Sequence, residues 1–185
     1  IMEKLYGKDY GEMLASLNLH ELHGEIESLR EKNQYADTRL KLNLEDRNPD
    51  EGVTSIAYNK GYFFLRSIEE KHGRDKFDAF LKDYFSENAF GSIDTDTFRK
   101  YITGYYRSNF NIALDTNIFE QWINTEGLPE SVPEPQSKRF AKVDQLVASW
   151  KTEKELDRSI GRDWSTHEWL HFLKNLPEDL SQEEM

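Results

Sequence analysis

The chain has 185 residues, enough for at least one domain of ordinary size. Its 24 lysines and arginines stand against 35 aspartates and glutamates, a net charge of −11, which argues against nucleic acids and membranes as partners because nucleic acids and anionic lipids bind basic surfaces. The absence of cysteine excludes disulfides, thiol nucleophiles and thiolate metal ligands. The compartment is left open, with the cytoplasm favoured over the periplasm or secretion.

The first quarter of the chain predicts two helices, a short extended segment and a turn. Gly7 closes the first helix, and apolar residues at steps of three to five predict an amphipathic helix that ends near Lys32. The alternation of leucines with polar residues in RLKLNL, residues 39–44, is the only clear period-two pattern and predicts a short extended piece. NPDEG at 48–52 is typical of a turn.

Further helices are predicted between residues 55 and 127. The strongest spans about 55–72. Asp75 is expected to cap the next helix, the segment around Asp94 to cap another, and Asp115 to start a short one. Aromatic residues dominate the apolar faces of these helices, among them Phe77, Phe80, Phe98, Tyr101, Phe119 and Trp122.

The best linker in the chain is EGLPESVPEPQ, residues 126–136, because it holds three prolines. Beyond it, Phe140, Val143, Val147 and Trp150 recur at helical spacing and predict a further helix. The sequence therefore predicts a mainly α chain that divides near residue 130.

Residues 167–171 read HEWLH, which fits the H-E-x-x-H pattern of zinc peptidases. Such a site needs both histidines on one helix face within a cleft, a glutamate that polarises the metal-bound water, and a third ligand further along the chain. His167 and His171 have the required spacing. The motif is therefore a candidate metal site that its surroundings must support.

The surroundings of HEWLH argue against zinc. At about 100° per residue, the apolar residues between Trp169 and Leu176 fall on one side of the helix and the two histidines on the other, so we expect the histidines to face solvent. Ser165-x-x-Glu168 is a capping box, which gives Glu168 a local role in the first turn. The chain ends at Met185 without a suitable third ligand. We favour a chance match and predict no metal ligand in this chain.

The middle of the chain carries an ordered series of motifs. RLKLNL is followed by NPD at 48–50 and by AYNKG at 57–61, which opens a long helix. The series continues through FLKDYF at 80–85, SIDTDTF at 92–98, WINTEGLP at 122–129 and STHEWLHFL at 165–173. In this order the motifs resemble the aminopeptidase-N-type zinc aminopeptidases, and specifically their leukotriene-A hydrolase branch.

The resemblance implies a fold and a division into domains. Residues 1–127 would be the helical rear half of a thermolysin-like catalytic domain, 128–137 a proline-rich linker, and 138–185 the truncated start of an α-helical C-terminal domain. The family's zinc-binding motif lies upstream of the matched region, and HEWLH corresponds to a position outside its active site. The resemblance therefore implies zinc and a peptide substrate for the intact enzyme, and no zinc bound by this part alone.

The resemblance also implies roles for individual residues. Tyr58 matches the family's tyrosine that donates a hydrogen bond to the oxyanion of the tetrahedral intermediate. Asp50 matches an acidic residue of the substrate pocket, although a turn-forming role fits it equally well. Leu42 and Leu44 match the pocket wall, and an ordinary strand core explains them as well. Val53 stands where the family often has an aromatic residue, which leaves the shape of the pocket open.

Two functions remain open at this stage. In the first, the chain is part of a zinc aminopeptidase that removes N-terminal residues from peptides, is inactive alone, and self-associates through apolar faces built to pack on other parts. The start at Ile1 and a second capping-box pattern, Ser181-x-x-Glu184, favour such a part. In the second, the chain is an acidic helical interaction module without catalysis, which uses aromatic residues to bind partners.

Overall fold

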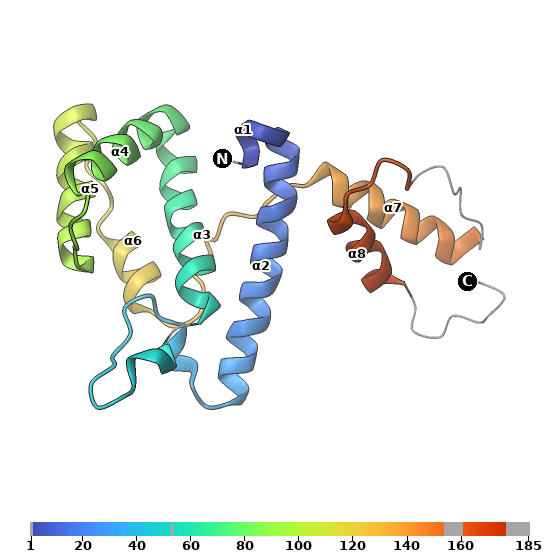
Figure 1. Ribbon diagram of the computed structural model, residues 1–185, viewed down its shortest axis with the longest axis horizontal. Helices are drawn as coiled ribbons and strands as arrows, with labels where there is room; N and C mark the ends of the chain where they lie inside the picture. Colours follow the sequence, from blue (N-terminus) through green and yellow to red (C-terminus); the bar gives the residue numbers. More distant parts are fainter. Residues whose placement is uncertain (1, 53, 154–160, 177–185) are drawn as a thin grey trace. The chain divides into compact units, whose positions relative to one another are not determined.

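The structure is a computed structural model that describes residues 2–52, 54–153 and 161–176 (Figure 1). Within these ranges it contains helices and no strand, which confirms the mainly α prediction. The predictions for Val53 and for Ser181-x-x-Glu184 lie outside the described residues.

The helical elements are α1 Met2–Tyr6, α2 Lys8–Glu31, η1 Tyr35–Thr38, η2 Pro49–Gly52, α3 Ser55–His72, α4 Arg74–Glu87, α5 Thr95–Phe110, α6 Asn117–Phe119, the π-helical segment η3 Glu120–Asn124, α7 Lys138–Glu153 and α8 Thr166–Asn175.

Most of the predicted helix ends are confirmed, and one cap is wrong. Gly7 and Gly73 adopt positive φ angles of 88° and 94° where α1 and α3 end, a conformation that glycine accepts without strain. Asp94 caps α5, because its side chain accepts a hydrogen bond from the Thr97 amide at 2.7 Å. Asp75 does not cap α4: the helix begins one residue earlier, directly after Gly73, and Asp75 lies in its first turn.

The period-two segment at residues 39–44 forms no strand. One backbone hydrogen bond links it to another part of the chain, from the Lys41 amide to the Ile123 carbonyl at 3.1 Å. That carbonyl belongs to the π-helical segment η3, so the neighbouring backbone is not extended and a ladder cannot continue. The alternating leucines therefore lie on an irregular segment that contacts η3.

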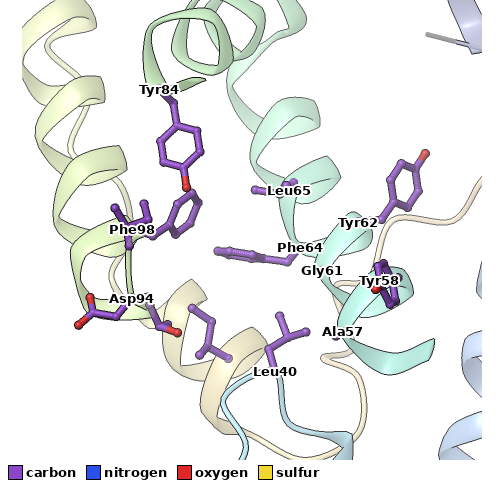
Figure 2. A pocket seen from close by; sticks show the side chains of 13 residues that line it. Leu40, Ala57, Tyr58, Gly61, Tyr62, Phe64, Leu65, Tyr84, Asp94 and Phe98 are labelled. Carbon is purple, nitrogen blue, oxygen red and sulfur yellow. The ribbon is translucent and has the colours of Figure 1, made fainter. Parts of the chain in front are cut away.

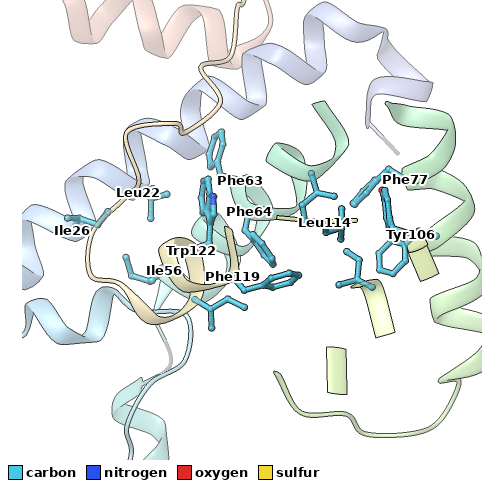
Figure 3. Close-up of a cluster of buried hydrophobic side chains, with 14 of the residues drawn as sticks. Leu22, Ile26, Ile56, Phe63, Phe64, Phe77, Tyr106, Leu114, Phe119 and Trp122 are labelled. Atoms are coloured by element: carbon cyan, nitrogen blue, oxygen red, sulfur yellow. The ribbon is translucent and has the colours of Figure 1, made fainter. Parts of the chain in front are cut away.

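The structure divides into two compact units, residues 18–133 and residues 1–17 together with 134–185. In the first unit, α3 packs against α4 and α4 against α5. Its core is rich in aromatic side chains, as Figure 3 shows for Phe63, Phe64, Trp122 and Phe119. Phe80 of α4 is fully buried, with six rings whose centroids lie 5.6 to 6.3 Å away, from Phe77, Tyr84, Phe98, Tyr101, Tyr105 and Tyr106.

The second unit has a smaller core. There α7 packs along α8, and Val143 and Val147 of α7 meet Phe172 of α8. None of the described helices is both long and apolar enough to cross a membrane. The domain limits expected at residues 127 and 138 remain a prediction.

Candidate active site

The first turn of α3 presents Tyr58 to solvent. The helix begins at Ser55 because the side chain of Thr54 accepts a hydrogen bond from the Ile56 amide at 3.3 Å. Tyr58 is 74% exposed, whereas the next two residues, Asn59 and Lys60, are buried. A tyrosine left this open on an otherwise well-packed helix is free to contact a ligand.

A mainly apolar cavity of about 630 Å³ runs beside this part of α3. Figure 2 shows Tyr58 and Tyr62 on one side of α3, while Tyr84 of α4 and Phe98 of α5 approach from the other. The cavity has the volume of an ordinary small-ligand pocket. Its apolar lining comes mainly from α3 and from the segments around it: Leu40, Ala57, Gly61, Phe64, Leu65, Ile93, Phe98 and Ile123.

The two leucines predicted for a pocket wall pack on the turn that carries Asp50. A Cβ atom added to Gly52 would lie 2.8 Å from Leu42 Cδ1 and 2.9 Å from Leu44 Cδ2, so a larger residue there would require the ends of both leucines to move. Neither leucine borders the 630 Å³ cavity, but Leu40, from the same period-two pattern, does. That pattern was the signal that could have identified Leu40.

Asp50 is exposed and lies on η2, and its amide donates to Asn48 Oδ1 at 3.1 Å. The loop from Asp37 to Arg47 is closed by two parallel hydrogen bonds of 2.7 and 2.8 Å between the Arg47 guanidinium and the Asp37 carboxylate. The bonds from Arg47 hold the pKa of Asp37 below its usual range. The structure thus brings Leu42, Leu44 and the Asp50 turn together, while Tyr58 borders a cavity that Asp50 does not line.

Polar contacts on the inner side of α3 were missed by sequence reasoning. Lys60 is fully buried, and its Nζ donates to the carbonyl oxygens of Thr38 and Thr125, each at 2.8 Å. Asn59 donates to Glu21 Oε2 of α2 at 3.2 Å. The K of AYNKG was the available signal, but only the folded chain shows which carbonyls it meets.

HEWLH lies on α8, and both of its histidines are half-buried, whereas the sequence predicted that they would face solvent. The His171 ring stacks on Phe140 of α7 with centroids 4.1 Å apart, and its Nε2 lies 2.7 Å from Asp144 Oδ1. The side expected to be buried is instead partly open, with Trp169 43% and Leu173 58% exposed. The predicted buried face is therefore confirmed for Phe172 and Leu176 and wrong for Trp169 and Leu173. The difference arises because α8 packs on α7 through His171 as well as Phe172.

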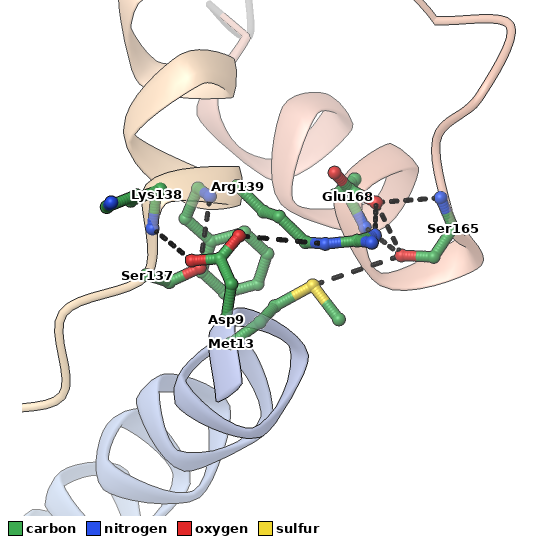
Figure 4. Close-up of polar contacts among 8 residues, drawn as sticks. Asp9, Met13, Ser137, Lys138, Arg139, Ser165 and Glu168 are labelled. Carbon is green, nitrogen blue, oxygen red and sulfur yellow. Dashed lines mark hydrogen bonds and ion pairs between the residues drawn. The ribbon is translucent and has the colours of Figure 1, made fainter. Parts of the chain in front are cut away.

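The role predicted for Glu168 is confirmed. Ser165 and Glu168 form a capping box, and Arg139 Nη1 donates to Glu168 Oε2 at 3.1 Å (Figure 4). Oε2 of this buried carboxylate thus accepts from the Ser165 amide and hydroxyl as well as from Arg139. In the described part of the chain, no three His, Asp or Glu side chains are grouped so that they could hold a metal ion.

Comparison with known proteins decides the family. Residues 1–122 match the peptidase family M1 domain. The chain belongs to peptidase family M1. Among the family's curated members, leucine aminopeptidase 2 of Candida albicans is 33% identical over 175 residues, and leucine aminopeptidase 2 of Ajellomyces capsulatus is 28% identical over 157 residues. These alignments cover 91% and 84% of this M1 chain but only 28% and 25% of the two relatives.

A solved structure of the M1 chain's fold is that of yeast LTA4 hydrolase in complex with bestatin, with a TM-score of 0.78 and 22% identity. That match covers all of this chain and 32% of the hydrolase chain. This match confirms the helical fold and shows that the M1 chain resembles an LTA4 hydrolase in fold. The M1 chain spans about a quarter to a third of the length of these relatives.

Proposed function

We propose that this chain supplies Tyr58 to the active site of a zinc aminopeptidase that removes N-terminal residues from peptides. Membership of peptidase family M1 and the aminopeptidase names of its relatives support the reaction class. The observation that carries the proposal is the exposure of Tyr58 at the start of α3, beside the apolar cavity.

The chemical role of Tyr58 follows from its phenol. Hydrolysis of a peptide bond passes through a tetrahedral intermediate whose oxygen carries a negative charge, and a positioned O–H donor stabilises that charge more than it stabilises the substrate carbonyl. Because Tyr58 is held on a helix and not on a loop, its donor can be aimed before the substrate arrives. Tyr58 would therefore act as the oxyanion donor.

Zinc would supply a Lewis acid to the intact enzyme. The described residues of this chain do not fit that ion, because they contain no suitable group of ligands. Because the family's zinc-binding motif lies upstream of the matched region, the proposal places the metal ligands outside this chain, and the 185-residue chain by itself is expected to be inactive. Peptide turnover by the purified chain would contradict this part of the proposal.

Asp50, Leu42 and Leu44 are proposed to contact the substrate. The exposed carboxylate of Asp50 could bind a polar or cationic group of a peptide, while Leu42 and Leu44 hold its turn in place through Gly52. In this arrangement the aspartate binds a polar part of the substrate, and the leucines form an apolar wall for the substrate as well as supporting the aspartate. Replacement of Asp50 by asparagine would then alter the choice of peptide more than the maximal rate.

The test is a Tyr58→Phe substitution in an enzyme that joins this chain to the zinc-binding part of the family domain. Loss of one oxyanion donor is expected to lower kcat by roughly 10²- to 10³-fold with little change in KM. Tyr62→Phe, one helical turn away and also exposed, is the matched control and is expected to stay within about twofold of the wild type. A kcat for Tyr58→Phe within the same twofold range would refute the proposal.

A second candidate function is an interaction module without catalysis. It is favoured by Phe85 and Phe90, which are 68% and 111% exposed near the end of α4. Under this reading Tyr58→Phe leaves the peptidase activity of the joined enzyme unchanged, whereas Phe85→Ser and Phe90→Ser weaken binding of a protein partner. The same set of variants therefore separates the two functions.

A further inference from the structure

The inner side of α3 buries a lysine that has no carboxylate partner among the residues that the structure describes. Lys60 has no exposed surface, and the hydrogen bonds of its Nζ go to two backbone carbonyls, of Thr38 and Thr125. These carbonyls lie 22 and 65 residues away in the sequence. A buried cation is costly, and an aliphatic side chain of similar length would fill the space without that cost. The two hydrogen bonds of the Lys60 ammonium therefore indicate a function for this lysine beyond filling space.

Both acceptors belong to a connected set of contacts. Thr38 Oγ1 donates to the Tyr35 carbonyl at 2.6 Å and accepts from the Gly127 amide at 2.8 Å. Gly127 has a φ of 67°, and a Cβ atom there would collide with the Tyr35 hydroxyl. We call Thr38, Lys60, Thr125 and Gly127 the Lys60 clasp. The clasp joins the segment before Leu40, the first half of α3 and the loop after η3.

The clasp lies directly behind Tyr58. Two residues along a helix correspond to about 200°, so Tyr58 and Lys60 point to nearly opposite sides of α3. Tyr58 is exposed on the outer side and Lys60 is fixed on the inner side. On the other end of the clasp, Thr38 precedes the segment that brings Leu40 to the cavity and Leu42 and Leu44 to the Asp50 turn.

We propose that Lys60 is a positioning residue, which through its bonds to the Thr38 and Thr125 carbonyls sets the first turn of α3, and hence Tyr58, against the segment of residues 39–44. The inference rests on the proposed function only where it treats Tyr58 as the oxyanion donor. Its geometric part, that the Lys60 ammonium fixes the two segments relative to one another, does not depend on any enzymatic activity. A substrate held by the 39–44 side would then meet the Tyr58 phenol at a fixed distance.

The absence of cysteine from the chain allows a test at the level of a single functional group. Lys60→Cys gives the chain one thiol, which is alkylated in denaturant with 2-bromoethylamine or with 1-bromopropane before refolding. The two products have nearly the same length and volume and differ only in a terminal ammonium or methyl group. Lys71→Met, an exposed lysine on the same helix, controls for the loss of a positive charge.

Two local readouts report the clasp in the 185-residue chain. Hydrogen exchange is measured at the amides of Lys41 and Gly127, which donate to the Ile123 carbonyl and to Thr38 Oγ1. The fluorine signal of 3-fluorotyrosine placed at position 58 reports the surroundings of the phenol. Amides of Tyr84 and Tyr106, in α4 and α5, serve as references for the stability of the whole unit.

The propyl product is expected to raise exchange at Lys41 and Gly127 by about tenfold or more and to move the fluorine signal, because the Thr38 and Thr125 carbonyls lose the donor that links them. The reference amides should change by less than about twofold. The aminoethyl product should restore both readouts. The inference would be overturned if the propyl product had the exchange rates and fluorine signal of the wild type, or if exchange rose equally at all four amides.

Thr38→Val provides a second arm if the propyl product does not refold. It removes the bond from Gly127 but keeps the carbonyl that Lys60 contacts, and Thr38→Ser is its matched control. The valine variant is expected to raise exchange at Lys41 and to move the fluorine signal, and unchanged values would count against the clasp. None of these measurements involves hydrolysis, so a failed clasp and a failed catalytic role for Tyr58 give different results.

Discussion

At the scale of single residues, Lys60 is expected to make the folding stability of the chain increase with pH in the alkaline range. Burial, and then the positive charge of Arg39, lowers the pKa of Lys60 from 10.5 to about 8. Between these two values the unfolded chain binds more protons than the folded chain, so the stability that depends on Lys60 rises with pH. A neutral amine still has two N–H groups, enough for both carbonyls.

We therefore predict that the difference in free energy of unfolding between the wild type and Lys60→Met grows from pH 7 to pH 9.5. Urea denaturation at several pH values measures it, and Lys71→Met corrects for general effects of alkali. The range stops below pH 10 because tyrosines of the unfolded chain ionise there, whereas burial holds the pKa of Tyr106 at about 12. A difference that is constant or falls with pH would show that Lys60 keeps an ordinary pKa.

Single residues were predictable from sequence only where a motif surrounded them. AYNKG led to Tyr58, which the structure leaves exposed beside a cavity, although its catalytic role remains a proposal. The same motif contains Lys60, but no local pattern indicates that two distant carbonyls converge on its ammonium. Leu42 and Leu44 were recognised as a pair, yet their contact with Gly52 depends on how the loop closes.

At the scale of elements, periodicity and capping predicted where the helices lie better than they predicted which face of each helix is buried. The long α2 and α3 have enough turns for their apolar stripes to be unambiguous. The alternating leucines formed no strand because the backbone beside them is helical, and pairing is a property of two segments. In the ten-residue α8, stacking of His171 on Phe140 competes with burial of Trp169 and Leu173, which the hydrophobic pattern alone cannot show.

The capping box of α8 leads to a prediction for that element. Ser165→Ala should lower the stability of α8 by about 1 kcal/mol, because the Glu168 amide loses its acceptor and the Glu168 carboxylate loses the Ser165 hydroxyl. Circular dichroism and urea denaturation measure the loss of helix. Ser165→Asp, which can still cap, should recover part of it, and the exposed neighbour Thr166→Ala should have little effect. Equal stability of Ser165→Ala and the wild type would mean that packing alone holds α8.

At the scale of the whole molecule, the two compact units have cores of very different size. Residues 18–133 hold a large cluster rich in aromatic side chains, whereas the described core of the other unit is smaller: Val143, Val147 and Phe172 form its cluster, and Met13, Phe140 and Trp150 are also buried. Burial of apolar surface is the main source of folding stability, so the second unit is expected to be the weaker one. The self-association expected from the sequence remains a prediction, supported by exposed side chains such as Leu5, Trp169 and Leu173.

Tryptophan fluorescence can test whether the units unfold separately, because the four tryptophans are divided between them. Trp122 lies in the large core, and Trp150, Trp164 and Trp169 lie in the other unit. Trp122→Phe leaves reporters only in the small unit, and replacement of the other three by phenylalanine leaves a reporter only in the large one. Each variant thus reports a unit that carries no substitution.

We predict that the small unit unfolds at a lower urea concentration than the large one, and that far-UV circular dichroism of the wild type shows both steps. Coincident midpoints for both variants and for the dichroism would mean that the chain unfolds as one cooperative unit, with the large core stabilising α7 and α8 as well.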